Sequence, residues 1–259
     1  MALRVATWNV NSLRVRLEQV CSWLEREQPE ILALQETKTR DAEFPAQAFA
    51  ALGYQSTFSG QATYNGVALI SKRPATEVCT QLANFPDPQR RVLAASIGRL
   101  RIVNLYVPNG QSVDSEKYRY KLAWLAALRE HAAAELAAHE QCVLLGDFNI
   151  APQDRDVHDP KAWEGKVLCS EPERQALVRL MELGLHDTFR LFEQAEQSFS
   201  WWDYRGAAFR RNIGLRIDLI LASDKLRSSC TQCHIDVEPR RWERPSDHTP
   251  VVATFEDRI

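Results

Sequence analysis

Polar side chains that can act on a phosphate group occur in five short clusters along the chain. Hydrolysis of a phosphate ester needs a metal to neutralise the phosphate, a base to activate water, and donors for the charge on the non-bridging oxygens. Magnesium prefers oxygen ligands, so its site contains Asp, Glu and Asn rather than Cys or clustered His. The clusters are residues 7–11, 34–38, 104–109, 146–149, and 216–218 together with 246–250.

Apolar runs and helical periodicity predict the elements that carry these clusters. The expected strands are residues 3–8, 30–34, 67–70, 91–97, 100–107, 143–146, 199–204, 215–221, 231–237 and 251–255. The expected helices are residues 13–27, after a cap at Ser12, residues 115–139, and residues 172–183. Polar clusters then follow strands in at least five places, where a sandwich can gather distant residues into one cleft.

A single domain over residues 1–259 is the simplest organisation, since no repeat or low-complexity linker divides the chain. We expect an α/β fold: a four-layered sandwich of two packed mixed β-sheets flanked by helices. Hydrophobic residues make up 45% of the sequence, enough to bury a core without disulfides or a structural metal.

The overall charge and the cysteine content restrict the class of protein. A net charge of −2 argues against a sequence-blind DNA coat, which is usually strongly basic. It does not exclude an enzyme acting on DNA, because a metal bound among carboxylates reverses the local field. We find no membrane-spanning run and no secretory signal, and the six scattered cysteines fit a reducing compartment. We therefore expect a cytoplasmic monomer with no membrane partner.

Taken in order, the clusters resemble the exonuclease III family of AP endonucleases, within the endonuclease/exonuclease/phosphatase superfamily. The resemblance covers residues 3–255. Its most specific motifs are WNV at 8–10, LQETK at 34–38, GDFN at 146–149, NIG at 212–214 with RID at 216–218, and SDH at 246–248. It implies a Mg²⁺-dependent DNA-repair hydrolase that cleaves the phosphodiester 5′ to abasic sites in duplex DNA. It also implies 3′-phosphatase, 3′-phosphodiesterase and 3′–5′ exonuclease activity on blocked 3′ ends, as in base excision repair.

The resemblance implies a metal site as well. Glu36 matches the family's principal metal carboxylate, and Asn9 and Asp247 match residues around the same ion. The expected cofactor is Mg²⁺, with Mn²⁺ able to substitute. Asn11 stands where some members carry Asp, so its part in metal binding stays open, as does the number of ions.

Three further residues match the family's acid–base group. Asp147 matches the residue that orients or deprotonates the attacking water. His248 matches a group that contacts the scissile phosphate, and Asp218 matches the carboxylate bonded to this histidine. A carboxylate partner keeps such a histidine cationic and oriented at neutral pH. The proton donor to the leaving group stays open.

Phosphate contacts are also implied for Asn109 and Asn149, and Tyr106 matches a tyrosine beside the phosphate. On pattern alone, Tyr106 fits an ordinary strand aromatic better than a catalytic group.

Residues 199–216 interleave aromatic residues with four arginines and one aspartate, a net charge of +3. Aromatics with arginines suit a surface that tracks the DNA backbone and stacks on bases or sugars. Arg210, Arg211 and Asn212 are the expected DNA contacts in this stretch, and Arg216 belongs to the same run. The alternative is ordinary core aromatics with solvated arginines.

One position departs from the family pattern. Leu215 stands where the family commonly carries Trp. The resemblance implies that this side chain, with Trp201 and Ile217, lines an apolar pocket for the base-free sugar. Leucine is smaller and cannot stack, so discrimination against normal nucleotides is in doubt.

Two other functions stay open. The first is a 3′-end processing phosphatase or exonuclease with little abasic incision. The second, from a different class, is a non-catalytic DNA-binding module, which has no reason to keep several carboxylates near phosphate. Phosphatases of lipids and inositol phosphates belong to the same superfamily, but the NIG motif and the aromatic–arginine stretch favour DNA.

Overall fold

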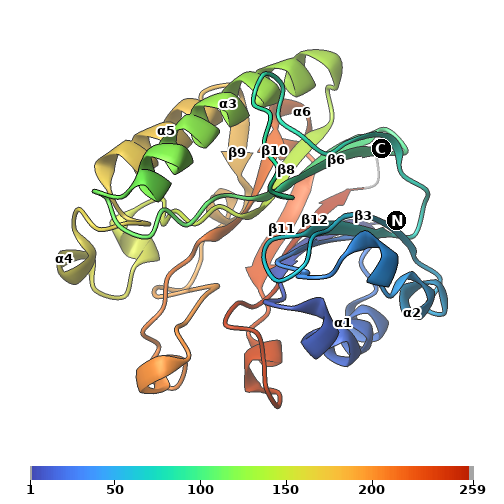
Figure 1. Cartoon of the computed structure of the whole chain (residues 1–259), viewed down its shortest axis with the longest axis horizontal. Coiled ribbons are helices and arrows are strands. Elements are labelled where there is room, and N and C mark those ends of the chain that lie inside the picture. The colour runs from blue at the N-terminus through green and yellow to red at the C-terminus, as the bar shows by residue number, and fades with distance from the viewer. Residues whose placement is uncertain (1, 257–259) are drawn as a thin grey trace.

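Two six-stranded β-sheets pack face to face, and helices cover their outer faces (Figure 1). The computed structural model describes residues 2–256. Each sheet contains one parallel pair among antiparallel neighbours, so both sheets are mixed. The predicted four-layered α/β sandwich is confirmed.

The first sheet holds both ends of the described chain. Its strands, in spatial order, are β11 (Cys230–Ile235), β12 (Val251–Glu256), β1 (Ala2–Asn9), β2 (Ile31–Gln35), β4 (Val67–Ser71) and β3 (Gln55–Ser59). Strands β1 and β2 are its parallel pair.

The second sheet is built from the middle of the chain. Its strands, in spatial order, are β5 (Thr76–Cys79), β6 (Val92–Ile97), β7 (Leu100–Tyr106), β8 (Cys142–Asp147), β10 (Asp218–Ser223) and β9 (Leu185–Asp187). Strands β7 and β8 are its parallel pair.

Helices α1 (Leu13–Glu27) and α2 (Ala46–Ala50) lie on the first sheet, and α3 (Glu116–Ala138) and α5 (Glu171–Met181) lie on the second (Figure 1). The shorter helical segments are α4 (Pro160–Trp163), α6 (Asp224–Arg227), η1 (Asp41–Glu43), η2 (Asp154–Asp156), η3 (Thr188–Leu191), η4 (Arg205–Ala207) and η5 (Glu238–Arg241). Ser12 precedes α1 as predicted, but its side chain makes no capping bond. Within residues 2–256, no helix is long and apolar enough to cross a membrane.

The central strands are buried on both faces, which explains their continuous apolar runs. On β2, Ile31 and Ala33 face the core between the sheets, while Leu32 and Leu34 face the core under α1. Successive side chains of a strand point to opposite faces, so one short strand serves two cores. This packing holds the strand ends, where the polar clusters lie, in fixed positions.

The structure also corrects some predicted elements. Residues 199–204 form a loop with isolated bridges at Trp201 rather than a strand. The strand expected at 215–221 begins only at Asp218. Strands β3, β5 and β9 were not predicted, and each lies at the edge of a sheet. Strand β5 is largely exposed, β3 is mostly half-buried and β9 spans only three residues, so none of them has the apolar run that reveals a central strand.

Candidate active site

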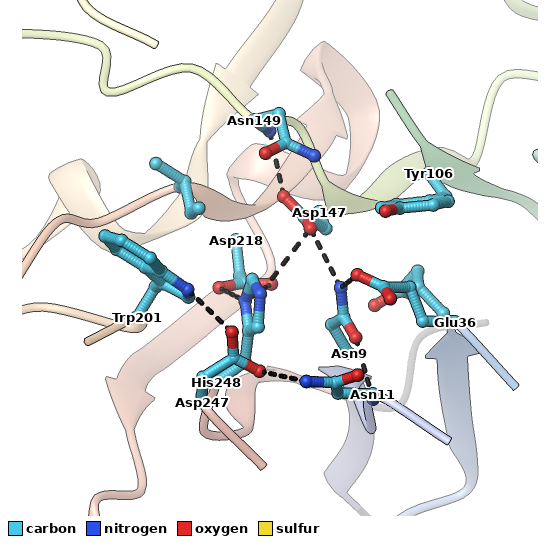
Figure 2. Close-up of polar contacts among 12 residues, drawn as sticks. Asn9, Asn11, Glu36, Tyr106, Asp147, Asn149, Trp201, Asp218, Asp247 and His248 are labelled. Atoms are coloured by element: carbon cyan, nitrogen blue, oxygen red, sulfur yellow. Dashed lines mark hydrogen bonds and ion pairs between the residues drawn. The ribbon is translucent and has the colours of Figure 1, made fainter. Parts of the chain in front are cut away.

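Side chains from both sheets converge at one end of the sandwich (Figure 2). Asn9 ends β1, and Glu36 follows β2 in the first sheet. Asp147 ends β8, and Asp218, its register partner, begins the antiparallel strand β10 in the second sheet. Parallel strands end at the same edge of a sheet, so the pairs β1–β2 and β7–β8 each deliver two polar clusters to this end.

The backbone around the site adopts conformations that ordinary residues rarely use. Glu36, Lys38 and Asn149 have positive φ angles of 50°, 52° and 49°. Non-glycine residues in this region are strained and cluster at functional sites. Gly146 has φ 145°, and a Cβ there would lie 1.9 Å from the Leu105 carbonyl oxygen. Glycine therefore lets β8 approach β7 closely, directly before Asp147.

A hydrogen-bonded group of Asn9, Glu36 and Asp147 lies at the centre of the site (Figure 2). The Asn9 Nδ2 donates to Glu36 Oε1 and to Asp147 Oδ2, both at 2.9 Å. Its Oδ1 accepts from the Asn11 backbone N–H at 3.0 Å. The Asn9 amide thus orients two carboxylates from different sheets.

This group fits a divalent cation. A carboxylate oxygen of Glu36 and one of Asp147 lie within 4.8 Å of each other. The two carboxylates supply the oxygen ligands that Mg²⁺ prefers. In the structure the Lys38 Nζ lies 2.9 Å from Glu36 Oε2, so a positive charge already balances this carboxylate. Lys38 belongs to the predicted 34–38 cluster, yet its part at the site was not predicted.

Asp247 lies beside this group rather than within it. The Asn11 Nδ2 donates to Asp247 Oδ1 at 2.9 Å, and the Trp201 Nε1 donates to Oδ2 at 3.0 Å. The pKa of Asp247 is lowered overall: burial raises it, but the His248 cation and the Trp201 bond outweigh burial. Lys38 also bonds the Asn11 Oδ1. Asn11 therefore connects Asp247 to the Glu36 side of the site.

His248 sits between two carboxylates. Its Nδ1 donates to Asp218 Oδ2 at 2.9 Å, and its Nε2 lies 3.7 Å from Asp147 Oδ2. Burial alone would lower the pKa of His248, but Asp218 and Asp147 outweigh it and raise this pKa to about 10. The histidine is therefore cationic at neutral pH, and the predicted Asp218–His248 contact is present.

Asp147 is almost fully buried, and burial raises its pKa above the usual range, against the opposing effect of the His248 cation. Its Oδ1 accepts the backbone N–H of Asn149 at 2.9 Å. A divalent cation beside Glu36 would favour the ionised form of Asp147, as a nearby positive charge does. The Tyr106 hydroxyl points toward this carboxylate (Figure 2). Burial and the charges of Glu36 and Asp147 raise the pKa of Tyr106, so it stays a neutral donor.

The two asparagines that were predicted to contact the phosphate lie next to each other. The Asn109 Nδ2 donates to Asn149 Oδ1 at 3.1 Å, and the Asn149 Nδ2 donates to the Val107 carbonyl at 3.0 Å. Asn109 is exposed, whereas Asn149 is buried. Beneath them, the buried Lys121 donates to both of their backbone carbonyls. Lys121 was missed in the sequence, although a lysine at the helical spacing of Leu125 and Leu128 is a signal.

The predicted apolar pocket is filled by its own side chains. Leu215 is 0% exposed and Ile217 is 2% exposed. Both belong to one cluster with Val157 and Leu168, and Trp201 packs against it. Trp201 also forms isolated backbone bridges with Leu215 and with His248, so the cluster adjoins the candidate site. The three predicted residues are together: Leu215 and Ile217 have almost no exposed surface, whereas Trp201 is partly exposed.

The aromatic–arginine stretch divides into a buried and an exposed part. Phe199 and Trp202 lie in a small core cluster, and Arg216 is 1% exposed, paired with Asp156 and Asp187. The inclusion of Arg216 in a DNA surface is therefore wrong, because its guanidinium is held inside by two carboxylates.

Arg210, Arg211 and Asn212 lie in the exposed part of the stretch. The Asn212 Oδ1 accepts from the Trp202 Nε1 at 3.1 Å, and its Nδ2 donates to the Gln197 carbonyl at 3.1 Å. Asn212 thus fastens the loop, and the two arginines project from it.

The fold and this site agree with the comparisons with known proteins. Residues 6–248 match the model of the Endonuclease/Exonuclease/phosphatase family, and the chain belongs to that family. Its relatives place it with the exonuclease III type of AP endonuclease, a metal-dependent phosphodiesterase nuclease of DNA repair.

Three relatives illustrate the similarity. Exodeoxyribonuclease III of Haemophilus influenzae is 36% identical, over 98% of this chain and 100% of that protein. The structure of the 3′ phosphatase NExo from Neisseria, bound to a product DNA hairpin, is 46% identical, with a TM-score of 0.97 over 98% of this chain and 99% of that one. An AP endonuclease from Archaeoglobus fulgidus is 39% identical, with a TM-score of 0.94 over 98% of this chain and 99% of that one.

Proposed function

We propose that this protein is a Mg²⁺-dependent hydrolase that removes blocking groups and nucleotides from 3′ ends of DNA. The observation that carries the proposal is the combination of a complete catalytic group with a closed apolar cluster. Glu36, Asp147 and His248 converge, whereas Leu215 and Ile217 have almost no exposed surface. A 3′ end presents its phosphate at a terminus, so no sugar has to be flipped out of a duplex. The similarity to the Neisseria 3′ phosphatase supports this preference.

The geometry supports the following roles. Glu36 would hold the ion, oriented by Asn9, and the bound Mg²⁺ supplies charge neutralisation at the phosphate. Asp247 would act on this site through its hydrogen bond with Asn11. Mn²⁺ favours similar oxygen ligands and would substitute.

Asp147 would orient and deprotonate the attacking water, because the Asn9 amide and the Asn149 backbone N–H fix both of its oxygens. The His248 cation would stabilise negative charge that develops on the phosphate, as would the neutral Tyr106 hydroxyl. Asn109 and Asn149 would donate to the non-bridging oxygens.

Incision 5′ to abasic sites is the second candidate activity. The Archaeoglobus AP endonuclease shares this fold at 39% identity, and every catalytic motif is present. An abasic sugar lacks a base, so flipping it out costs less than flipping a normal nucleotide. Leu215 and its neighbours would have to part to admit the sugar, which disfavours this activity relative to 3′-end processing.

Two labelled duplexes test the choice, one with a 3′-phosphate and one with an internal abasic analogue, each assayed with Mg²⁺ and with chelator. We expect fast, Mg²⁺-dependent phosphate release and slow incision. Leu215→Trp should change the ratio of the two rates more than the rate of phosphate release, because it alters the apolar cluster beside the site and not the catalytic side chains. Faster incision than phosphate release by the parent protein would restore abasic incision as the main activity. If the parent protein bound DNA but showed neither activity, the alternative of a non-catalytic DNA-binding module would be favoured.

The proposed function also implies a partner and a location. Duplex DNA is the expected macromolecular partner, and Arg210 and Arg211 are expected to contact the DNA backbone. The six cysteines are free thiols, which fits a reducing compartment and the expected cytoplasmic location. We expect the protein to act as a monomer, because the proposed site is complete within one chain.

A further inference from the structure

We propose that Lys121 is a positioning residue of the reaction, which holds the phosphate-binding asparagines in place through their backbone carbonyls. The proposal rests on the proposed function, which gives Asn109 and Asn149 their contact with the scissile phosphate. Lys121 itself touches no reacting atom.

The ammonium group of Lys121 is fully used inside the protein. Lys121 projects from α3 and is 0% exposed. Its Nζ donates to the Asn149 carbonyl at 2.7 Å and to the Asn109 carbonyl at 3.2 Å, and it pairs with the Glu173 carboxylate. Three N–H groups thus meet three acceptors. The first two acceptors belong to the segments that follow β7 and β8, so one side chain ties both segments together.

The Glu173 carboxylate is itself held rigidly. It belongs to a capping box at the start of α5, where Ser170 is the N-cap residue. Its Oε1 accepts the Leu168 backbone N–H at 3.0 Å, and its Oε2 accepts the Ser170 backbone N–H at 3.1 Å. Glu173 is 0% exposed, so it has no alternative partner in water. The pair therefore also fixes the loop that carries Leu168 into the apolar cluster beside the site.

The backbone at one anchored position is unusual. Asn149 has a φ of 49°, a left-handed conformation that few non-glycine residues adopt, although asparagine tolerates it better than most. The Asn149 side-chain Oδ1 accepts a hydrogen bond from Asn109 Nδ2 at 3.1 Å. A shift of either carbonyl would move both amides relative to the phosphate. Misplacement by about 1 Å can cost on the order of 10²-fold in rate.

A purely structural role does not require this ion pair. A buried ion pair is weak evidence for stability, since well-packed apolar residues of similar volume often serve as well. Lys121 differs from such residues in donating to two site carbonyls, which an apolar side chain cannot do. The same helix offers a comparison, because Arg101 forms a buried pair with Glu135 on α3. Beyond this pair, Arg101 donates to the Glu77 carbonyl and to Ser96, which lie outside the candidate site.

The test compares two neutralised pairs, K121M/E173Q and R101M/E135Q, in the full-length protein. The 3′-phosphatase kcat is measured per folded molecule, DNA affinity is measured with Ca²⁺ in place of Mg²⁺, and the Tm is recorded for both. We expect both variants to lose Tm. Only K121M/E173Q should lose kcat, by about 10²-fold, with DNA affinity nearly unchanged. Equal kcat values per folded molecule for the two variants would overturn the positioning role.

A second variant, K121Q/E173Q, keeps two N–H donors at the position of the ammonium group. Its kcat should lie between those of K121M/E173Q and the parent protein, and it decides the matter if K121M/E173Q does not fold. A kcat for K121Q/E173Q equal to that of R101M/E135Q would contradict the proposal. Asn149→Ala separates the two ideas: if it keeps full turnover, the proposed phosphate contact is wrong and the positioning role falls with it. If Asn149→Ala is impaired while the Lys121 variants match the control pair, only the positioning role is wrong.

Discussion

Single side chains at the site work through shared partners. The Asn9 amide joins Glu36 to Asp147, and Asp147 in turn lies 3.7 Å from His248. The charge of each carboxylate therefore influences the pKa of its neighbour. Substitutions at this scale should affect the chemical step more than the fold, because these residues make up the site and not the apolar core.

Glu36→Ala should lower Mg²⁺-dependent turnover by at least about 10²-fold, since losing a metal carboxylate weakens charge neutralisation at the phosphate. The measurement is a Mg²⁺ titration of 3′-phosphate release, with circular dichroism as the control for folding. Near-normal turnover at limiting Mg²⁺ would show that the metal assignment is wrong.

Asp147→Asn should damage turnover far more than DNA binding. Asparagine keeps the shape of the side chain but cannot accept a proton, and loss of a general base costs on the order of 10²- to 10⁴-fold. Single-turnover rates with Mg²⁺ and affinities with Ca²⁺ separate the two effects. Parallel losses in both quantities would instead indicate a structural role for Asp147.

At the scale of elements, the loop from 199 to 216 performs two tasks. Its buried arginine, Arg216, joins η2 to β9 through Asp156 and Asp187. Its exposed arginines, Arg210 and Arg211, face solvent. Replacing the exposed arginines should therefore change DNA binding, whereas replacing the buried arginine should change the stability of the fold.

Replacing Arg210 and Arg211 together with Ala should weaken DNA binding and flatten its salt dependence. Each lost phosphate contact should reduce the log–log salt slope by about 0.9. Arg216→Met is the matched control: it should cost about 3–5 kcal/mol of folding free energy, because two buried carboxylates lose their partner. Its folded fraction should keep the parent salt slope. An unchanged slope in the double variant would make Arg210 and Arg211 ordinary solvated residues.

For the whole molecule, the position of one sheet relative to the other determines how the two halves of the site meet. Asn104 on β7 is fully buried, and its Nδ2 donates across the interface to the Leu34 and Ala68 carbonyls at 3.0 and 2.9 Å. The Gln35 Nε2 donates back to the Asn104 Oδ1 at 2.8 Å. This polar bridge lies one residue before Glu36, so it sets how the two halves of the site meet.

Asn104→Leu should lower the free energy of unfolding by about 1–3 kcal/mol, the cost of leaving buried polar groups unpaired. It should also lower kcat, because Glu36 and Asp147 come from different sheets. Ile102→Val, in the core between the sheets, should cost about 0.5–1.5 kcal/mol without changing kcat. Urea unfolding and turnover are measured for both. A kcat for Asn104→Leu equal to that of Ile102→Val would mean that the bridge contributes only stability.

The sequence by itself determined the class of fold, the family resemblance and most of the site. Continuous apolar runs such as 31–34 and 143–145 are typical of strands buried on both faces, and motifs at their ends point to metal-assisted chemistry. The contact between Asp218 and His248 was predicted from the resemblance and is present. The local sequence is enough to predict these features, because residues that are close in the chain determine both the burial of a strand and the side chains at its end.

Tertiary structure alone decided the features that depend on distant residues. Edge strands such as β9 gain their pairing from a neighbour, so their own sequence carries little signal. Arg216 reads as a DNA contact until Asp156 and Asp187 are placed around it, and Leu215 reads as a pocket wall until its neighbours fill the space. The position of Lys121 on the apolar face of its helix signals burial, but its partners lie in other segments, so the sequence does not reveal what it binds. Burial and partnership are properties of three-dimensional packing, which side-chain type alone does not fix.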